Sequence, residues 1–356
     1  MPTKPKLLID EATTVLDNFY NIKTQSIKSL PSYDDLNFLI TTSTSTKVVL
    51  KVFHEEFSSD ENRVSEQAEL QQFWFNSGIA VPQIIKTKEG LLQKKLKTKM
   101  ANGKDGECYV RLLEFIEGEM LQKLPVEEQF FSEIGEAIAK CHLLMERKGS
   151  SEKFPFTSKL KHIWSIERVV NPEWEERIAT LESEETTASV KAAIKDFKEI
   201  LKNNCDLPSG VVHGDLNSLN IIGEKDESGK AALKAFIDFG DVCGSALVFD
   251  LSIAVLYHMV AVFTKTSSLE SVYQPISWLL RGYLHSRKLT EAEINAIYYA
   301  VRARAAQSVL GAYHTLSTEP ENREYLLSEA GPAEKLLNEM QNLTKEQFLL
   351  RIIPKL

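Results

Sequence analysis

Two short polar segments, each bordered by an apolar run, constrain the fold of this 356-residue chain more than any other feature. The first, Val211–Asn220, reads Val-Val-His-Gly-Asp-Leu-Asn-Ser-Leu-Asn, and the second, Ala235–Asp241, reads Ala-Phe-Ile-Asp-Phe-Gly-Asp. Their apolar, partly β-branched residues predict two short strands flanking a loop. The chain between them suits a hairpin that turns within Glu224–Lys230, which would bring Asp238 back beside Asn220.

The polar side chains of these segments are the ones that phosphoryl transfer requires. One carboxylate orients an attacking hydroxyl and accepts its proton, while an amide oxygen and a second carboxylate hold Mg²⁺ on the phosphates. Asp215 is therefore predicted as the base, and Asn220 and Asp238 as the metal ligands. His213 is expected to support the loop by hydrogen bonding. Neither His-Gly-Asp nor Asp-Phe-Gly is specific alone, but together, in this order and spacing, they indicate a kinase.

Length and composition limit the class of protein. A chain of 356 residues is too long for one simple core, so two lobes are expected. The net charge of −8 argues against nucleic acid or an anionic membrane as a partner and would suit a small cationic substrate. The four cysteines lie far apart without a Cys-x-x-Cys pair, which predicts reduced thiols rather than disulfides or a zinc site.

The pattern of apolar residues predicts neither export nor membrane insertion. Met1–Asp10 lacks the apolar core of a signal peptide, and together with the reduced cysteines this predicts a cytoplasmic protein. The apolar run Leu247–Phe263 is interrupted by Asp250 and His258, so it is expected to be a buried helix. Asp250 is expected to be an N-cap of this helix rather than a residue of the site.

The first 115 residues predict a small lobe of antiparallel strands. Turn residues between two apolar stretches predict a hairpin over Ile27–Ile40, followed by a strand at Val48–Phe53. A helix is expected over Glu61–Asn76, and a buried strand over Tyr109–Ile116. The lysine-rich residues 86–107 are interpreted as an exposed hairpin rather than a nucleic-acid patch, because no aromatic residues alternate with the charges.

Lys51 is the one charged residue in the strand Val48–Phe53. A lysine in a strand usually reaches solvent, but in kinases a strand lysine paired with a helix glutamate positions the nucleotide phosphates. Glu66 and Glu69 share one face of the following helix, and Glu66 is favoured as the partner. Two solvated glutamates remain the alternative.

The end of the last strand in this lobe predicts a further contact with the nucleotide. Backbone groups of Glu114, Phe115 and Ile116 lie where the chain would leave the small lobe. We expect them to bind the edge of a purine.

After Gly118 the periodicity becomes helical. Thr290 and Glu293 predict a capping box, and Gly331-Pro332 is expected to divide the last long helix. His142 is expected to be a structural histidine with its hydrogen bonds satisfied. The expected helices are Gln129–Arg147, Glu173–Lys202, Leu269–Ser286, Glu291–Leu316 and Glu319–Asn342. The sequence thus predicts a nucleotide-binding lobe at 1–115 and a larger helical lobe at 116–356, which holds the catalytic loop and the acceptor site.

These motifs resemble those of the aminoglycoside phosphotransferase/choline kinase superfamily, and most of all its hydroxylysine kinase branch. The similar stretches run from about residue 30 to about residue 330: Leu30–Asp35 with Asn37-Phe38, Val110–Leu113, His213–Asn217, Asp238–Asp241, and Pro320–Asn322 with Tyr325-Leu326. The resemblance implies an α+β, protein-kinase-like fold of two lobes. It also implies Mg²⁺-dependent transfer of the γ-phosphate of ATP or GTP to the hydroxyl of a hydroxylated amino acid or amino alcohol.

One segment departs from the protein-kinase pattern. Pro31–Leu36, the turn expected over the phosphates, contains no glycine. Ser32 and backbone amides would have to take that place, as in the similar branch.

The acceptor is less constrained than the reaction. If it is an amino acid, Arg304 is the candidate for binding its carboxylate, because an arginine fork can bind a carboxylate bidentately. A structural salt bridge of Arg304 to an acidic neighbour is the alternative. An aminoglycoside phosphotransferase, or a kinase of homoserine, choline, ethanolamine or methylthioribose, is the alternative for the function. A nucleotide-binding pseudokinase is disfavoured, because the lysine, base and metal-ligand residues are all present.

Overall fold

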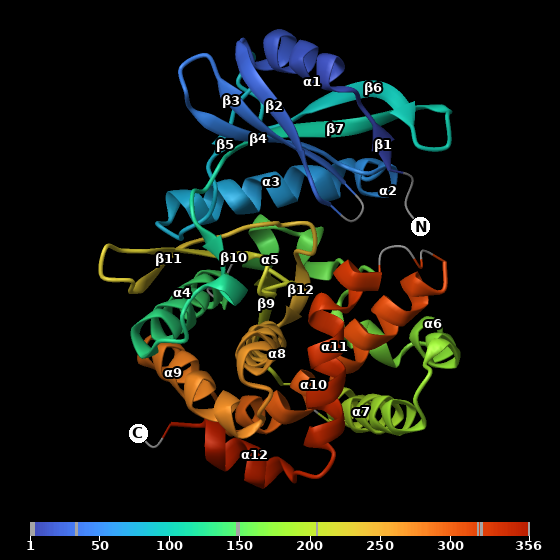
Figure 1. Ribbon diagram of the computed structural model, residues 1–356, viewed down its shortest axis with the longest axis vertical. Coiled ribbons are helices and arrows are strands. Elements are labelled where there is room, and N and C mark those ends of the chain that lie inside the picture. The colour runs from blue at the N-terminus through green and yellow to red at the C-terminus, as the bar shows by residue number, and fades with distance from the viewer. Residues whose placement is uncertain are drawn as a thin grey trace. The chain divides into compact units, whose positions relative to one another are not determined.

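The computed structural model describes residues 4–32, 35–146, 150–203, 206–318, 320 and 323–354. The chain divides into two compact units, Met1–Glu117 and Gly118–Leu356. An antiparallel sheet forms the centre of the first unit, whereas the second is mainly helical (Figure 1). The α+β fold class expected from the sequence is confirmed by these two units.

The first unit is built on one sheet in which every strand pair is antiparallel. The strands are β1 (Pro5–Lys6), β2 (Thr24–Leu30), β3 (Leu36–Thr42), β4 (Lys47–Val52), β5 (Ile84–Ile85), β6 (Lys94–Met100) and β7 (Asp105–Glu114). Their order is β1-β6-β7-β4-β3-β2, and β5 also pairs with β7. The predicted hairpin over Ile27–Ile40 is confirmed as β2 and β3, and the predicted strand that carries Lys51 as β4.

Helices cover both faces of this sheet (Figure 1). They are α1 (Ile9–Val15), continued by a π-helical turn at Leu16–Tyr20, α2 (Glu55–Ser58) and α3 (Glu61–Asn76). The predicted helix Glu61–Asn76 is confirmed as α3, and it begins where the Asp60 carboxylate accepts hydrogen bonds from the next backbone N–H groups. Leu16 packs with Ile40 and Leu50 in the core on the α1 side of the sheet, because alternate residues of β3 and β4 point to this face.

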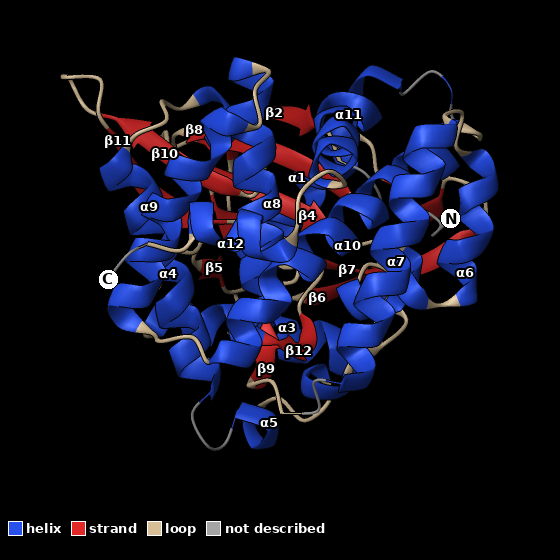
Figure 2. Ribbon diagram, turned by 90° about the horizontal axis from the view of Figure 1, so that it is seen from below, coloured by secondary structure: helices blue, strands red, loops and turns tan. Residues whose placement is uncertain are grey.

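The second unit contains two small sheets. Their strands are β8 (Glu119–Met120), β9 (Ser209–Val212), β10 (Ile221–Lys225), β11 (Ala231–Phe236) and β12 (Cys243–Ala246). The predicted hairpin is confirmed as β10 and β11, because Asp226 N–H donates to the Lys230 oxygen across 2.9 Å and Ile221 lies opposite Phe236. β9 pairs with β12 in a separate antiparallel ribbon, visible as short red arrows near α5 (Ser150–Lys153) in Figure 2.

Among the helices of the second unit, α8 (Leu247–Thr266) packs against the three that follow it in the chain. The others are α4 (Glu128–Glu146), α6 (Pro172–Glu175), α7 (Glu184–Asn203), α9 (Glu270–Ser286), α10 (Glu291–Leu316), α11 (Arg323–Met340) and α12 (Lys345–Ile352). By length and composition α8 could cross a membrane, yet 94% of its most apolar window is buried inside the protein. The expected buried helix is therefore confirmed, and its hydropathy is explained by its position in the core.

Two glycines let α4 and α9 cross closely. A Cβ atom on Gly135 would lie 1.9 Å from the Leu279 oxygen, and one on Gly282 would lie 1.9 Å from the Ser132 oxygen. Any side chain at either position would therefore force the two helices apart. This crossing holds α4, which carries His142, beside α9, which carries Tyr283.

Three sequence expectations about helices have mixed outcomes. The capping box is confirmed, since Glu293 N–H donates to Thr290 Oγ1 across 3.1 Å and Thr290 N–H to Glu293 Oε2 across 2.9 Å. The single helix over Glu173–Lys202 is wrong, because α7 starts after Ser183, whose side chain accepts a hydrogen bond from Thr186 N–H. Gly331-Pro332 does not divide α11, because the helix continues through it to bury its apolar face.

Candidate active site

The loop His213–Asn220, between β9 and β10, carries the predicted base. Gly214 has a φ of +82°, and a Cβ atom there would lie 2.1 Å from the Asp241 oxygen. Only glycine therefore allows the loop to approach Asp241 this closely. Gly214 N–H donates a hydrogen bond of 2.8 Å to Asp250 Oδ1, which attaches the loop to α8.

A buried chain of hydrogen bonds continues from Asp250 into the helical core. Its second oxygen, Oδ2, accepts from His142 Nε2 across 3.0 Å, and His142 Nδ1 accepts from the Tyr283 hydroxyl across 2.8 Å. Burial acts to raise the pKa of Asp250, but the hydrogen bond from His142 and the electrostatic interactions with His142 and His213 lower it overall. Asp250 is therefore an ionised anchor for the loop.

These contacts correct one expectation and confirm another. Asp250 is not an N-cap, because α8 begins three residues earlier at Leu247 and its cap position, Ala246, makes no side-chain hydrogen bond. The helix starts early because the apolar residues before Asp250 are themselves helical and buried. The expectation that His142 is a satisfied structural histidine is confirmed, since both ring nitrogens are hydrogen-bonded.

His213 joins the two polar segments of the chain. Its Nδ1 accepts from Asp215 N–H across 3.3 Å, so Nε2 carries the proton and donates to the Ile237 oxygen across 3.1 Å. Burial lowers the pKa of His213, which favours this neutral form. These bonds are those of a residue that supports the loop.

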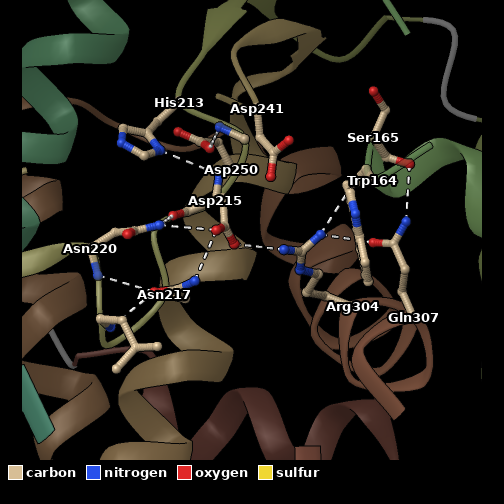
Figure 3. A network of polar contacts seen from close by, with 12 residues as sticks. Trp164, Ser165, His213, Asp215, Asn217, Asn220, Asp241, Asp250, Arg304 and Gln307 are labelled. Atoms are coloured by element: carbon tan, nitrogen blue, oxygen red, sulfur yellow. Dashed lines mark hydrogen bonds and ion pairs between the residues drawn. The ribbon is translucent and has the colours of Figure 1, made fainter. Parts of the chain in front are cut away.

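Asp215 lies between two asparagines and an arginine (Figure 3). Its Oδ2 accepts from Asn217 Nδ2 across 2.8 Å and from Asn220 Nδ2 across 3.0 Å. Its Oδ1 pairs with Arg304 Nη2 across 2.7 Å. The side chain of Asp215 is only 17% exposed, so these bonds largely fix its position.

The surroundings of Asp215 shift the pKa of its carboxyl group. Burial raises its pKa, the guanidinium of Arg304 opposes this rise, and the carboxylates of Asp241 and Glu329 add to it. For Arg304, burial acts to lower the pKa, but Tyr257 and the nearby carboxylates raise it overall. Arg304 is thus a permanent cation beside the predicted base.

The two predicted metal ligands, Asn220 and Asp238, are brought together by one backbone hydrogen bond. Ile237 N–H donates to the Asn220 oxygen across 2.9 Å, which brings Asp238 next to the loop. Asp238 has a φ of +60°, and its Oδ1 accepts from Gly240 N–H across 3.2 Å. The Nδ2 of Asn220 donates to the backbone oxygen and Oδ2 of Asp215, which leaves its Oδ1 as the acceptor.

Carboxylate and amide oxygens are the donors that Mg²⁺ takes, so Asn220 and Asp238 fit this ion chemically. Among the residues that the structure describes, no group of three or more His, Cys, Asp or Glu side chains is placed to hold a metal alone. Two protein oxygens suit Mg²⁺, because it keeps waters and takes phosphate oxygens as its remaining ligands. The metal-binding roles of both residues stay predictions.

Contacts with other residues of the second unit fix the side chain of Arg304. Its Nη1 donates to the Trp164 oxygen across 3.1 Å and to Gln307 Oε1 across 2.9 Å, and its guanidinium lies 5.7 Å from the centre of the Tyr257 ring. The structure therefore contains a salt bridge of Arg304 to an acidic neighbour, and that neighbour is Asp215.

Sequence reasoning missed two polar residues that shape this loop. Asn217 Oδ1 accepts from the N–H groups of Leu219 and Asn220 at 2.9 and 3.0 Å, which closes an Asx turn that the local sequence could have suggested. Ser218 Oγ donates to Glu329, which is 111 residues away on α11. No local pattern marks that second contact.

In the first unit, Lys51 forms an ion pair with Asp35. Lys51 Nζ lies 3.0 Å from Asp35 Oδ2, and Asp35 Oδ1 accepts from His54 N–H across 2.9 Å. Only 9% of the Lys51 side chain is exposed. Glu66 is half-buried on α3 and Glu69 is exposed, so the predicted pairing of Lys51 with Glu66 stays a prediction.

Arg111 attaches α3 to the sheet beside Lys51. The two residues are register partners on β7 and β4. The Arg111 guanidinium is buried and donates to Gln67 Oε1 across 2.5 Å and to the Val64 oxygen across 3.2 Å. Sequence reasoning noted the stretch Val110–Leu113 but assigned this arginine no role.

The remaining predicted nucleotide contacts also lie in the first unit. Ser32 Oγ donates to the Asp35 oxygen across 2.6 Å, so it closes its turn, while residues 33 and 34 lie outside the described residues. Glu114 N–H donates to the Gln83 oxygen at 2.9 Å and Phe115 N–H to the Lys47 oxygen at 3.3 Å. Ile116 follows the end of β7, and the contacts of these residues with a purine stay predictions.

The amino-acid sequence is similar to one protein family and to several known kinases. The model of the phosphotransferase enzyme family, APH, matches residues 26–271. Hydroxylysine kinase of Bos taurus is 27% identical over 357 residues, which cover 97% of this chain and 92% of that protein. Homoserine kinase of Agrobacterium fabrum is 27% identical over 319 residues, or 85% of this chain and 87% of that protein.

Solved structures of similar fold are also kinases. A microcompartment-associated aminopropanol kinase superposes with a TM-score of 0.72 at 16% identity, covering 96% of this chain and 100% of that one. The amicoumacin kinase structure with AMP-PNP and Ca²⁺ superposes with a TM-score of 0.68 at 14% identity, covering 95% and 96%. These similarities confirm the kinase-like fold that the sequence motifs implied.

Proposed function

The chain belongs to the phosphotransferase enzyme family and is a small-molecule kinase, and we propose that its acceptor is a hydroxylated amino acid or amino alcohol. We further propose that the donor is ATP or GTP and that Mg²⁺ is required. The hydroxylysine kinase and homoserine kinase relatives support an acceptor that carries both a hydroxyl and an amine. The negative charge of the chain is compatible with such a cation.

The observation that carries the proposal is the fixed carboxylate of Asp215. Two asparagines and Arg304 hold its oxygens, and the loop behind it is attached to the core through Gly214 and Asp250. A carboxylate positioned in this way can accept a hydrogen bond from an acceptor hydroxyl and orient that oxygen for attack.

Asp215 need only be a weak base. In a loose phosphoryl-transfer transition state the hydroxyl proton leaves late, so the carboxylate contributes mainly by orienting the hydroxyl. Arg304 favours the ionised form of Asp215, in opposition to burial. Asn220 and Asp238 would hold Mg²⁺, which when bound neutralises charge on the phosphates. Lys51 would bind phosphate oxygens.

Arg304 stays the candidate for binding an acceptor carboxylate. Its Nη groups donate to Asp215, Trp164 and Gln307, and its Nε–H is buried without a hydrogen-bond partner among the described residues. We propose that an amino-acid acceptor places its carboxylate against this guanidinium. Arg304→Lys should then raise KM for homoserine more than KM for aminopropanol, which has no carboxylate.

The proposal is tested by a nucleotide-consumption screen with ATP and GTP, with and without Mg²⁺. The acceptors are hydroxylysine, homoserine, aminopropanol, choline, ethanolamine, methylthioribose and kanamycin. We expect turnover with an acceptor from the amino acids or amino alcohols, and its loss on chelation of Mg²⁺. Turnover with kanamycin alone would favour the aminoglycoside phosphotransferase alternative.

A variant at a predicted metal ligand provides the control. Asp238→Asn should weaken nucleotide binding in the presence of Mg²⁺ and leave metal-free nucleotide binding unchanged, as measured by calorimetry. Equal Mg²⁺-dependent affinity in the variant and the wild type would remove Asp238 from the metal site.

A further inference from the structure

Glu329 on α11 contacts the loop His213–Asn220, although the two are far apart in the sequence. Its Oε1 accepts a hydrogen bond from Ser218 Oγ, and Ser218 follows Asp215 by three residues in that loop. Both residues lie in the second unit, and Glu329 is half-buried. This carboxylate is not among the groups assigned to phosphoryl transfer.

Glu329 forms no ion pair with a cationic side chain among the described residues. Buried Glu293, by contrast, pairs with Arg287 at 2.8 Å. Arg304 acts on Glu329 electrostatically, but its nearest carboxylate contact is Asp215 at 2.7 Å. Burial accordingly raises the pKa of Glu329 against the hydrogen bonds from Ser218 and the charge of Arg304.

Glu329 also acts electrostatically on Asp215, since its charge adds to the raised pKa of that carboxyl. The buried phenol of Tyr257 has a raised pKa, caused first by burial, while Arg304 lowers it and both Asp215 and Glu329 raise it. The charges of Asp215 and Glu329 therefore both act on Tyr257, which lies on α8. Since Ser218 links Glu329 directly to the loop of Asp215, a short acceptor could contact the two acids at once.

We propose that Glu329 binds the protonated amine of the acceptor while Asp215 binds its hydroxyl. This inference rests on the proposed function and names the residue that selects amine-bearing acceptors. A half-buried carboxylate without a paired cation is costly unless a ligand supplies the positive charge. The ammonium would bind the carboxylate that Ser218 holds in place, and the separation of the two acids would set the spacing of amine and hydroxyl.

The test compares acceptors that differ only in the amine. One pair is homoserine and 4-hydroxybutanoate, and the other is 1-amino-2-propanol and 2-propanol. For whichever pair the enzyme uses, Glu329→Gln should lower kcat/KM of the amine acceptor about 10- to 100-fold, the worth of a charge-assisted hydrogen bond. The kcat/KM of the amine-free acceptor and the KM of the nucleotide should not change.

Two further variants separate binding from structure. Glu334→Gln, on the same helix, changes a carboxylate that accepts hydrogen bonds from Thr186 and Tyr313, and it should keep the preference for amines. Glu329→Asp should restore part of the preference, because it restores the negative charge.

The outcomes distinguish this inference from the proposed function. If the wild type uses amine acceptors but Glu329→Gln keeps the full preference, or Glu334→Gln loses it equally, the inference is wrong and the function stands. If the wild type uses no amine-bearing acceptor, both are wrong.

Discussion

Lys51 in the first unit and Arg304 in the second are both buried cations paired with a carboxylate, yet they are held very differently. Arg304 is fixed by backbone and side-chain acceptors of its own unit, Trp164 and Gln307, and its carboxylate partner is the predicted base. The carboxylate paired with Lys51 is Asp35, which lies just before β3 in the β2–β3 turn.

The difference indicates in which of the two ion pairs a ligand could replace the carboxylate. The Arg304–Asp215 pair holds the predicted base, whose position must persist through turnover. The Lys51–Asp35 pair satisfies a buried lysine with an anion that a phosphate could replace. The first pair would therefore orient the predicted base, and the second would keep the predicted phosphate-binding lysine charged and in place.

Removing the carboxylate from the Arg304 pair should have the largest effect. Asp215→Asn keeps the size of the side chain but cannot accept a proton, so kcat should fall about 10²- to 10⁴-fold. Mg²⁺-nucleotide affinity should survive, as measured by calorimetry, because Asp215 is not expected to bind the metal. A melting curve controls for the unpaired Arg304, and near-normal kcat in a folded variant would contradict the role of Asp215.

Removing the lysine from the other pair should affect phosphate positioning. Lys51→Ala should cost about 2.7–4 kcal/mol of transition-state stabilisation, the size of one preorganised charged contact. The measurement is kcat/KM for the nucleotide at saturating acceptor. Lys47→Ala, an exposed lysine on the same strand, is the matched control and should change little. Near-normal turnover of Lys51→Ala would show that this lysine does not bind phosphates.

Loss of the anchor behind the base should have a moderate effect. Asp250→Asn retains an acceptor for Gly214 N–H, but its amide opposes the donor on His142 Nε2. One unsatisfied buried group costs about 1–3 kcal/mol of unfolding free energy, and kcat should fall with the misplaced loop. Denaturant unfolding and kcat are measured together. A stability loss with unchanged kcat would mean that Asp250 supports only the core.

Removing the charge of Asp35, the ion-pair partner of Lys51, should change nucleotide affinity. Asp35→Asn keeps an oxygen for His54 N–H but removes the charge that competes with phosphate for Lys51. Nucleotide affinity should increase about two- to fivefold when measured by calorimetry, because Asp35 no longer competes with phosphate for Lys51. Weaker binding would instead mean that Asp35 itself contacts the nucleotide or its metal.

The smallest effect concerns pH. The pKa of Glu329 is raised in the folded protein, so the folded state binds this proton more readily than the unfolded state. The stability contributed by Glu329 therefore decreases as pH rises from the ordinary pKa through the raised one. Melting temperatures of Glu329→Gln and the wild type should diverge in favour of the variant as the pH rises above the ordinary carboxyl pKa of about 4. A constant difference would mean that Glu329 is not desolvated.

Local sequence patterns alone determined much of this molecule. Alternating apolar residues defined β3 and β4, the 3.6-residue period defined α3 and α10, and turn residues placed the β10–β11 hairpin that returns Asp238 to Asn220. Each of these features depends on interactions among residues close in the chain, so the amino-acid order carries the signal. The kinase assignment followed because its loop residues are also close in sequence.

The tertiary structure alone decided which distant residues complete the site. Arg304 lies 89 residues from Asp215, Asp250 lies 36 residues from Gly214, and Glu329 lies 111 residues from Ser218. No spacing rule connects such pairs, because they meet only through the packing of α8, α10 and α11 around the loop. That packing also determines burial, and burial sets the electrostatic environment of Asp215 that its sequence neighbours could not reveal.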